Sequence, residues 1–173
     1  MNIKKAIIIS LLTPILSTAQ SNFRLNQTEF FTVSVSIDPS SSIKEQGLDY
    51  VAEIEYAGNI YAKIGFEQFS AIYGGYNDIH GAFGINFTSG YFEKIRYYTG
   101  VRMGNVYRGS QGAFRTIYGL ESGIDYEVKD DITLGLRSTL DKRIDQEIFG
   151  WEPESKFSGF IRICYKWKYN NHH

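Results

Sequence analysis

The chain has 173 residues, of which 43% are hydrophobic, 16% aromatic and 21% charged, and its formal net charge is −1. This length fits one domain, the near-neutral charge is unlike that of a nucleic-acid-binding protein, and a single cysteine excludes an internal disulfide. The 13 tyrosines, 12 phenylalanines and 17 glycines favour a β-rich globular protein over a disordered chain.

Residues 1–19 have the pattern of a secretory signal peptide. Lys4 and Lys5 form a positive n-region, residues 6–16 form an apolar h-region, and small residues follow them. The apolar run is too short to cross a bilayer as a helix, which needs about 20 residues. We therefore expect an exported protein in which residues 20–173 form one domain.

The rest of the chain repeats a two-residue alternation of apolar and polar residues eight times, whereas helical periodicity is hard to find. One face of each segment is apolar and contains no Asp, Glu, Lys or Arg, as Leu134, Leu136 and Leu140 illustrate. Short and long connections alternate between the segments, which is typical of an antiparallel up-and-down barrel. The predicted strands span residues 28–37, 47–57, 59–70, 78–88, 93–104, 113–128, 131–141 and 157–169.

The volume of an eight-stranded barrel indicates which face points outward. Its interior holds side chains or one small ligand, so the many large apolar residues predict an outward band of the kind that lipid requires. The fold class that we expect is all-β, an eight-stranded antiparallel transmembrane barrel. Aromatic residues near the strand ends would form interfacial girdles: Tyr56, Phe87, Tyr126, Trp167 and Tyr169 at the short-turn end, and Tyr50, Phe114 and Phe157 at the long-loop end.

The opposite, inward faces carry acidic and basic residues in nearly equal numbers. Because buried charges are tolerated only when paired, we interpret this face as an ionic network that plugs the lumen; a narrow channel or proton path is the alternative. The expected network consists of Glu53, Glu55, Lys63, Glu67, Lys94, Arg96, Arg102, Arg115, Glu121, Asp125, Arg137, Asp141, Arg162 and Lys166.

The sequence offers little catalytic chemistry. His80, two residues after Asp78, is either an acid–base group or a hydrogen-bonded lumenal histidine. Cys164 lies between inward cations, which lower a thiol pKa, but a small buried thiol is the ordinary explanation. Ser122 and Ser138 face outward without a histidine partner. We expect no catalytic, cofactor-binding or metal-ligating residues, no cofactor, and a protein that is not an enzyme.

The connection over residues 142–156 is the longest and contains one of the two tryptophans. Phe149 and Trp151 lie in it among acidic residues, and loops on rigid scaffolds commonly carry function. Two interpretations stay open: an exposed aromatic recognition surface, or a loop that buries its own aromatics over the barrel mouth.

The chain resembles the small eight-stranded outer-membrane barrels of the OmpA/OmpX type. The resemblance rests on the export signal, strand number, alternation, loop rhythm and the aromatic-rich final strand over residues 160–169. It implies a monomeric, porin-like barrel in the outer membrane of a Gram-negative bacterium, in contact with lipid and not with nucleic acid. Its role would be structural or adhesive, with surface recognition through the long loops.

Two other functions stay open. The second hypothesis is an exported soluble calycin-like barrel that binds a small apolar ligand, and the third hypothesis is a lipid-modifying outer-membrane barrel enzyme.

Overall fold

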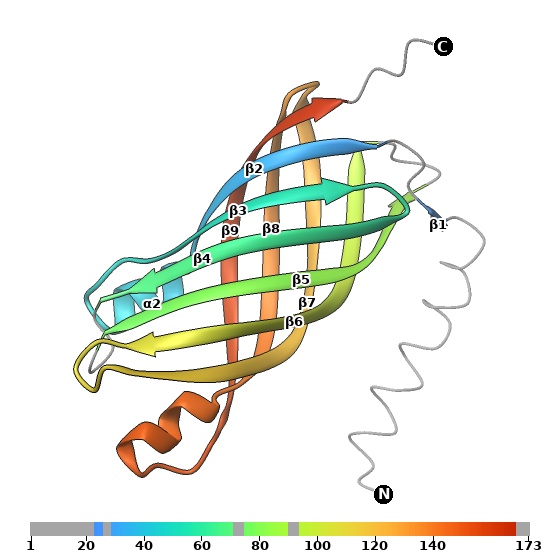
Figure 1. Ribbon diagram of the computed structural model, residues 1–173. Coiled ribbons are helices and arrows are strands. Elements are labelled where there is room, and N and C mark those ends of the chain that lie inside the picture. The colour runs from blue at the N-terminus through green and yellow to red at the C-terminus, as the bar shows by residue number, and fades with distance from the viewer. Residues whose placement is uncertain (1–22, 26–28, 71–74, 90–93, 169–173) are drawn as a thin grey trace, which may run out of the picture.

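A computed structural model describes residues 23–25, 29–70, 75–89 and 94–168 (Figure 1). The expected signal peptide, residues 1–19, lies outside the described residues, as does Tyr169. The described elements are β1 (Phe23–Leu25), β2 (Phe30–Ile37), α2 (Pro39–Lys44), β3 (Asp49–Ala57), β4 (Ile60–Phe69), β5 (Tyr76–Ser89), β6 (Ile95–Arg108), β7 (Ala113–Lys129), β8 (Ile132–Lys142), η1 (Ile144–Phe149) and β9 (Ser155–Lys168).

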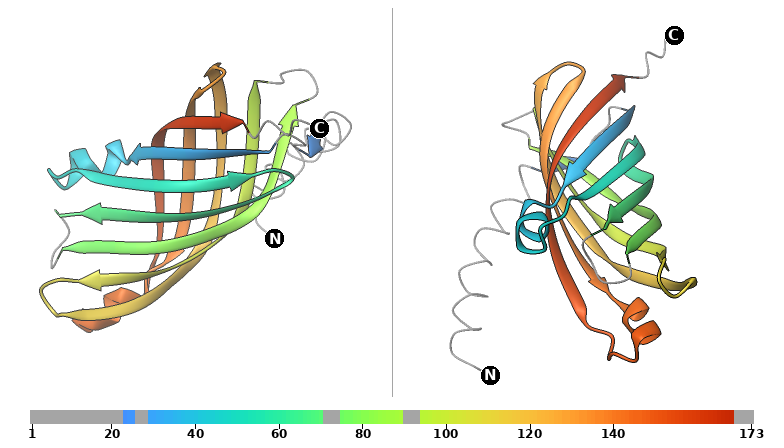
Figure 2. Two further views of the ribbon diagram at one scale, coloured as in Figure 1. Left: turned by 45° about the horizontal axis from the view of Figure 1, so that its top comes forward. Right: turned by 90° about the vertical axis from the view of Figure 1, so that its left-hand side faces the viewer.

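Strands β2 to β9 form a closed barrel in which every neighbouring pair is antiparallel (Figures 1 and 2). Each strand pairs with the next one along the chain, and β2 closes the barrel against β9. We call the end that carries α2 and η1 the loop end, and the end that carries the tight β3–β4 and β7–β8 connections the turn end. The predicted fold class, with its eight strands, is confirmed.

The observed strand bounds differ from the predicted ones by a few residues. The largest difference is β6, which runs on to Arg108, four residues past its predicted end. Strand β1 was not predicted, because three residues are too few to show an alternation. It pairs with residues Phe87 to Ser89 of β5. The pairing of β4 with the same edge of β5 ends at Ile85, so β1 covers the part of this edge that β4 leaves free.

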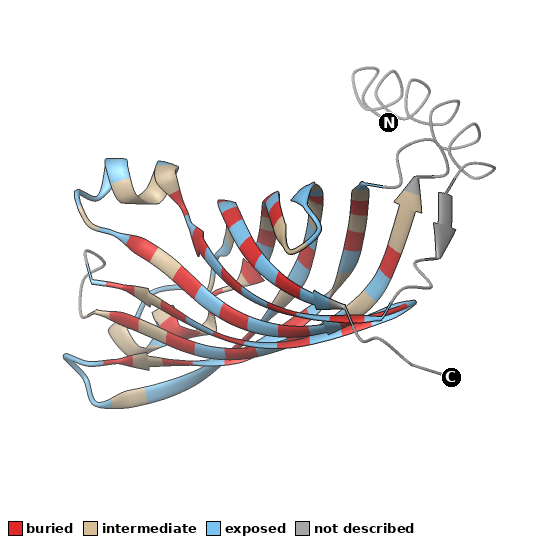
Figure 3. Ribbon diagram, turned by 90° about the horizontal axis from the view of Figure 1, so that it is seen from above, coloured by how far each residue is buried: buried red, intermediate tan, exposed pale blue. Residues whose placement is uncertain are grey.

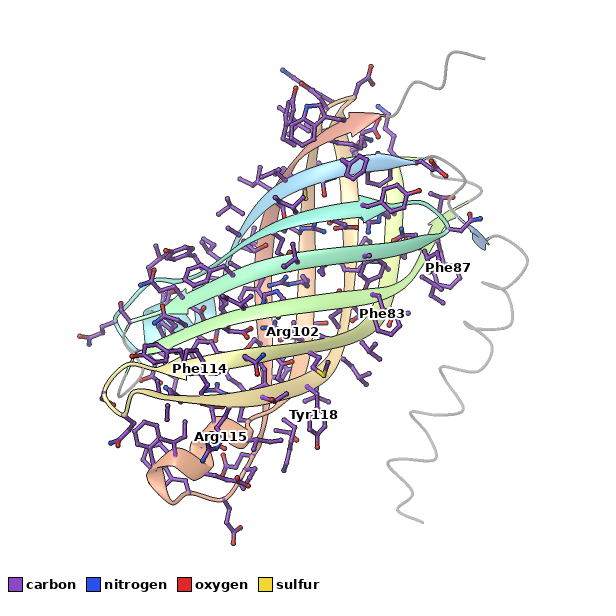
Figure 4. The ribbon with its side chains drawn as sticks, viewed as in Figure 1. Phe83, Phe87, Arg102, Phe114, Arg115 and Tyr118 are labelled. Carbon is purple, nitrogen blue, oxygen red and sulfur yellow. The ribbon has the colours of Figure 1, made fainter. Side chains whose placement is uncertain are left out.

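Burial alternates residue by residue along β2, β3 and β8, and less regularly along β7, as the striped ribbons of Figure 3 show. The exposed positions are apolar: Val35, Ile54, Leu120 and Ile163 are each more than half exposed. In Figure 4, Phe83 and Tyr118 lie on the outside of the barrel wall. A soluble barrel for an apolar ligand would turn this face inward, so the prediction of an outward apolar face is confirmed.

Two small apolar layers lie inside the barrel, one towards each end. Phe30, Ala57, Tyr61, Ala82 and Tyr98 form the layer towards the turn end. Phe69, Tyr76, Val106 and Ile117 form the layer at the loop end. The charged residues of the lumen therefore lie largely between two apolar layers.

Inward glycines make room for the large side chains of the turn-end layer. A Cβ atom at Gly100 would collide with the backbone of Phe83 and the hydroxyl of Tyr61, and one at Gly123 would collide with the ring of Tyr98. Strand glycines are expected where another group approaches the backbone closely.

Among the described residues, no helix is long and apolar enough to cross a membrane.

Candidate functional site

Of the fourteen residues expected in the lumenal network, twelve lie buried inside the barrel. Several charged residues that the expected list omits join them there, among them Asp49 and Asp78. The twelve are Glu53, Glu55, Lys63, Glu67, Arg96, Arg102, Glu121, Asp125, Arg137, Asp141, Arg162 and Lys166.

Two arginines and two carboxylates form a cluster nearer the turn end. Arg162 of β9 donates from Nη2 to Glu55 Oε2 at 2.6 Å and from Nη1 to Asp125 Oδ2 at 3.2 Å. Arg96 of β6 binds the same two carboxylates and donates from Nε to Asn86 Oδ1 at 2.9 Å. The bonds of both arginines to Glu55, and that of Arg162 to Asp125, connect strands that are not neighbours in the sheet, whereas Arg96 and Asp125 lie on the adjacent strands β6 and β7.

A second cluster occupies the middle of the lumen. Lys63 Nζ of β4 lies 2.9 Å from Glu121 Oε2 and 3.4 Å from Glu53 Oε1. Arg137 of β8 also donates to Glu53, and Tyr61 donates its hydroxyl hydrogen to Glu121 Oε1 at 2.6 Å. The Glu53–Arg137 and Tyr61–Glu121 bonds each join strands three places apart in the barrel order, so they cross the lumen.

A third cluster lies towards the loop end around Arg102, which Figure 4 labels inside the barrel. Its Nη2 donates to Glu67 Oε2 at 2.9 Å and to Asp78 Oδ2. His80 lies between Asp78, 2.9 Å from Nδ1, and Glu53, 3.3 Å from Nε2. His80 therefore links this cluster to the middle one, and its environment is that of a hydrogen-bonded lumenal histidine.

Glu67, Asp78 and His80 have ligand atoms within 4.8 Å of one another, which is a spacing that a metal ion could use. Arg102 already donates to both carboxylates. A cation would have to displace this guanidinium, so the donor set fits an internal ion pair better than a metal centre.

Two expected members of the network lie elsewhere, and the prediction for them is corrected. Lys94 is exposed in the connection before β6, which begins only at Ile95. Arg115 is exposed on a part of β7 that extends past β8, because β8 pairs with β7 only from Tyr118 onwards. Its Nη1 donates to its neighbour's carbonyl, that of Phe114, at 3.0 Å.

Other buried charges were missed by the sequence reasoning. Asp49 and Asp78 lie on the inward register of predicted strands, so the alternation could have identified both. Arg108, Arg143 and Asp145 could not be found this way, because the first lies past the predicted strand end and the other two lie in a loop.

The loop over residues 142–156 folds into a compact unit. Arg143 N donates to Glu154 O at 2.9 Å across its base. Gln146 accepts from Trp151 N at its carbonyl (3.2 Å) and from Glu154 N at its side-chain oxygen (2.7 Å). Gly150 ends η1 in the left-handed conformation (φ 74°), which favours glycine.

Asp145 anchors this loop to the barrel. It accepts from Arg143 Nε at 2.7 Å and from Arg108 Nε at 2.8 Å, and both arginines are buried. Burial alone would raise the pKa of the Asp145 carboxyl, but the hydrogen bonds and charges of Arg143 and Arg108 outweigh burial and lower this pKa below its ordinary value. Asp145 is therefore an ionised carboxylate held between two cations.

The two aromatic residues of the loop have different environments. Phe149 is half-buried, with the Arg108 guanidinium 5.3 Å from its ring centroid. The Trp151 ring packs against that of Phe149, with centroids 5.2 Å apart and the two planes tilted by 32°, yet Trp151 remains 52% exposed. Phe149 is thus partly buried, as a loop folded over the barrel mouth predicts, while Trp151 is exposed; recognition by this loop stays a prediction.

Comparison with known proteins matches the fold. No family model and no curated protein matches this chain. Solved structures do: a barrel from the de novo design of transmembrane β-barrels has a TM-score of 0.51 at 14% identity, covering 83% of this chain and 98% of that one. Neisserial surface protein A (NspA) has a TM-score of 0.51 at 12% identity, covering 82% and 97%. The Yersinia pestis outer membrane protein Ail, in a phospholipid bilayer nanodisc, has a TM-score of 0.51 at 10% identity, covering 82% and 100%. The architecture is that of small transmembrane barrels.

Proposed function

We propose that this chain is an integral barrel of a Gram-negative outer membrane, with a non-enzymatic structural or adhesive role at the cell surface. The observation that carries the proposal is the outward apolar face on a closed barrel. Lipid tolerates neither unpaired strand edges nor polar outward faces, and this barrel has neither over most of its described wall. The similarity to an outer-membrane protein and a surface protein supports the location.

The filled lumen favours a barrel that is closed to solutes. Contacts with partners would then be made by the loops. Its arginines and lysines bind carboxylates on non-neighbouring strands, and eight strands leave little room for water beside such side chains. The exposed Trp151 makes the loop over residues 142–156 the favoured site of surface recognition. The protein would act as a monomer surrounded by outer-membrane lipid.

Cell fractionation tests the location directly. The wild-type protein should be recovered in the outer-membrane fraction and be released only by detergent, and its unboiled and boiled forms should migrate differently on a gel. Recovery from the soluble periplasmic fraction without detergent would overturn the proposal and favour a soluble calycin-like barrel.

A further inference from the structure

We infer that Asp49 is a proton-sensitive switch at the loop end of the barrel, which holds α2 in place when it is protonated and loosens α2 when it is ionised. Asp49 is the first residue of β3. It lies on the loop side of Tyr50, a residue expected in the loop-end girdle, and therefore outside the lipid-facing part of the strand. The inference goes beyond the proposed function, because it requires only the contacts of Asp49 within the described chain.

The backbone of Asp49 joins α2 to β3. Asp49 O accepts from Asp38 N at 3.0 Å, and Asp49 N donates to Ser42 Oγ at 2.9 Å. Asp38 in turn caps α2, since its carboxylate accepts from Ser41 N at 2.9 Å and from Ser41 Oγ at 2.7 Å. We call these four residues, Asp38, Ser41, Ser42 and Asp49, the α2 junction. A change that moves Asp49 is therefore passed directly to α2.

The α2 junction lies where β2 no longer covers β9. Strand β2 pairs with β9 only as far as Ile37 with Ile161, whereas β9 begins at Ser155. Beyond the end of β2, α2 lies against both β9 and β3 (Figure 1). Helix α2 thus takes the place of β2 in this part of the barrel wall, and loosening it would uncover the wall there.

The carboxyl group of Asp49 is buried without a hydrogen bond. Asp49 is 0% exposed, and within the described chain neither of its carboxyl oxygens accepts a hydrogen bond. Its ion-pair partner is Lys156, whose Nζ lies 3.9 Å from Asp49 Oδ2, too far for a hydrogen bond. An ionised carboxylate that is neither hydrated nor hydrogen-bonded is costly, so this environment favours the protonated, neutral form.

The charges that face Asp49 come from four neighbouring parts of the wall. The acidic ones are Asp38, which follows β2, and Glu67 of β4, and both are buried. The basic ones are Lys156 of β9 and Arg137 of β8. Burial is the largest of the effects that raise the pKa of the Asp49 carboxyl to about 7; the two carboxylates add to it and the two cations oppose it.

The raised pKa sets the direction of the switch. An Asp carboxyl in an unfolded chain has a pKa of about 3.9. A raised carboxyl pKa adds stability that is fully present below this unfolded value and is lost as the pH rises through the folded value of about 7. Above it, the ionised Asp49 faces Asp38 and Glu67 as like charges. We therefore expect α2 to be held below neutral pH and to be loosened above it.

This switch is separate from the anchor of the loop over residues 142–156. That loop is held by Asp145, which accepts hydrogen bonds from Arg143 and Arg108. The pKa of the Asp145 carboxyl is lowered, so it stays ionised throughout the range in which Asp49 titrates. Trp151 should therefore keep its environment while α2 responds to pH.

Infrared spectroscopy of the full-length barrel in detergent tests the protonation of Asp49. We expect the band of a protonated carboxyl group to disappear with a midpoint near pH 7, and Asp49→Asn to remove this band. Lys156→Met takes away an opposing cation and should raise the midpoint by about one pH unit. The matched control, Lys44→Met, removes an exposed lysine of α2 and should leave the midpoint unchanged.

Hydrogen–deuterium exchange of residues 39–47 tests the effect on α2. After correction for the intrinsic dependence of exchange on pH, exchange in the wild type should be about tenfold faster at pH 8 than at pH 6. This factor follows from a carboxyl pKa of about 7 in the closed form and about 3.9 in the open form. Asp49→Asn, whose amide cannot ionise, should lose the dependence on pH, and Lys44→Met should keep it.

The absence of a carboxyl band that Asp49→Asn removes would overturn the inference, as would the same midpoint in Lys156→Met and the wild type. Equal exchange of α2 at the two pH values would overturn it too, because Asp49 would then ionise without moving α2. Heat-modifiable migration reports the folding of each variant, and Lys156→Met decides the matter if Asp49→Asn does not fold. Recovery of the protein from the soluble periplasm would overturn the proposed function and leave this switch standing.

Discussion

At the residue scale, single side chains in this barrel serve several partners at once. Arg162 binds Glu55 and Asp125, and Arg96 binds the same pair. Removing one member of a buried ion pair commonly costs about 3–5 kcal/mol, because a charge is left behind without its partner. In a shared cluster the remaining arginine still faces both carboxylates, so losing either arginine should cost less than losing both.

Asp145 gives the loop a predictable dependence on pH. Its carboxyl pKa is lowered in the folded loop, from about 3.9 in an unfolded chain. A lowered carboxyl pKa adds stability that is fully present above the unfolded pKa and is lost as the pH falls through the lower, folded pKa. We therefore expect the loop to stay closed from neutral pH down to about pH 4 and to open below it.

The fluorescence of Trp151 measures this opening. A Trp167→Phe variant leaves Trp151 as the sole tryptophan of the two in the chain, and its quenching by acrylamide should increase only in acid. Asp145→Asn should show the increased quenching at neutral pH already. Opening of the wild-type loop as the pH rises from 5 to 8 would contradict the assignment of Asp145 as the anchor.

At the scale of the element, each strand has one face for lipid and one for the lumen. On β7, Leu120 is 57% exposed on the outer face. Leu120→Arg should destabilise the barrel by about 2–4 kcal/mol, the range for a cation near the bilayer midplane, and should reduce assembly. Arg115→Ala, on the exposed end of the same strand, should change stability by less than about 0.5 kcal/mol.

Unfolding in urea, followed by the shift between folded and unfolded gel bands, compares the two variants. Equal stability of the Leu120→Arg barrel and the wild type in lipid vesicles would show that the outer face does not lie in hydrocarbon. The matched Arg115→Ala variant shows how far a substitution on β7 changes stability when it does not place a charge on the outer face.

The loop over residues 142–156 can be removed as a unit, because Lys142 and Ser155 pair at its base. An Asn-Gly turn between these two residues has the geometry of a tight hairpin. Since long surface connections add little to stability, we expect the shortened barrel to fold and to lose surface binding.

Heat-modifiable migration and binding to cells or host protein report these two properties separately. A folded, shortened barrel that keeps every surface phenotype would show that the loop is only a lid. Failure to fold would show that the barrel needs the contacts of this loop with the buried Arg108, which are the carboxylate of Asp145 and the half-buried ring of Phe149.

The strands and their two faces could be predicted from the sequence because the alternation is a local property. The buried members of the network follow from the same alternation, as Glu53 and Arg162 illustrate. Lys94 was misplaced because β6 begins one residue after it, at Ile95, and the alternation does not mark where a strand begins. Arg115 was misplaced because β8 ends before it reaches this part of β7, and the length of a neighbouring strand cannot be read from the pattern of β7. The contact of Arg108 with Asp145 joins residues 37 apart, and no periodicity connects them.

At the scale of the whole molecule, the lumen joins the walls of the barrel through opposed charges. Because Arg96, Glu121 and their partners neutralise one another across the interior, we expect the barrel to be closed to solutes. Protein reconstituted in a planar bilayer should show no steady single-channel conductance at neutral pH. A reproducible ion-selective step that disappears in Arg96→Ala or Glu121→Ala would instead support a channel.

The closure of the barrel by β2 and β9 also has a consequence for the order of assembly. These strands pair from Phe30 with Lys168 to Ile37 with Ile161, so the first and the last strand of the barrel meet along one seam. As long as β9 is missing, β2 and β8 each keep an open edge, and hydrocarbon does not tolerate open edges. In the proposed membrane location, a chain that stops before Ser155 would therefore leave its barrel open, and we expect insertion to finish only after β9 has reached the membrane.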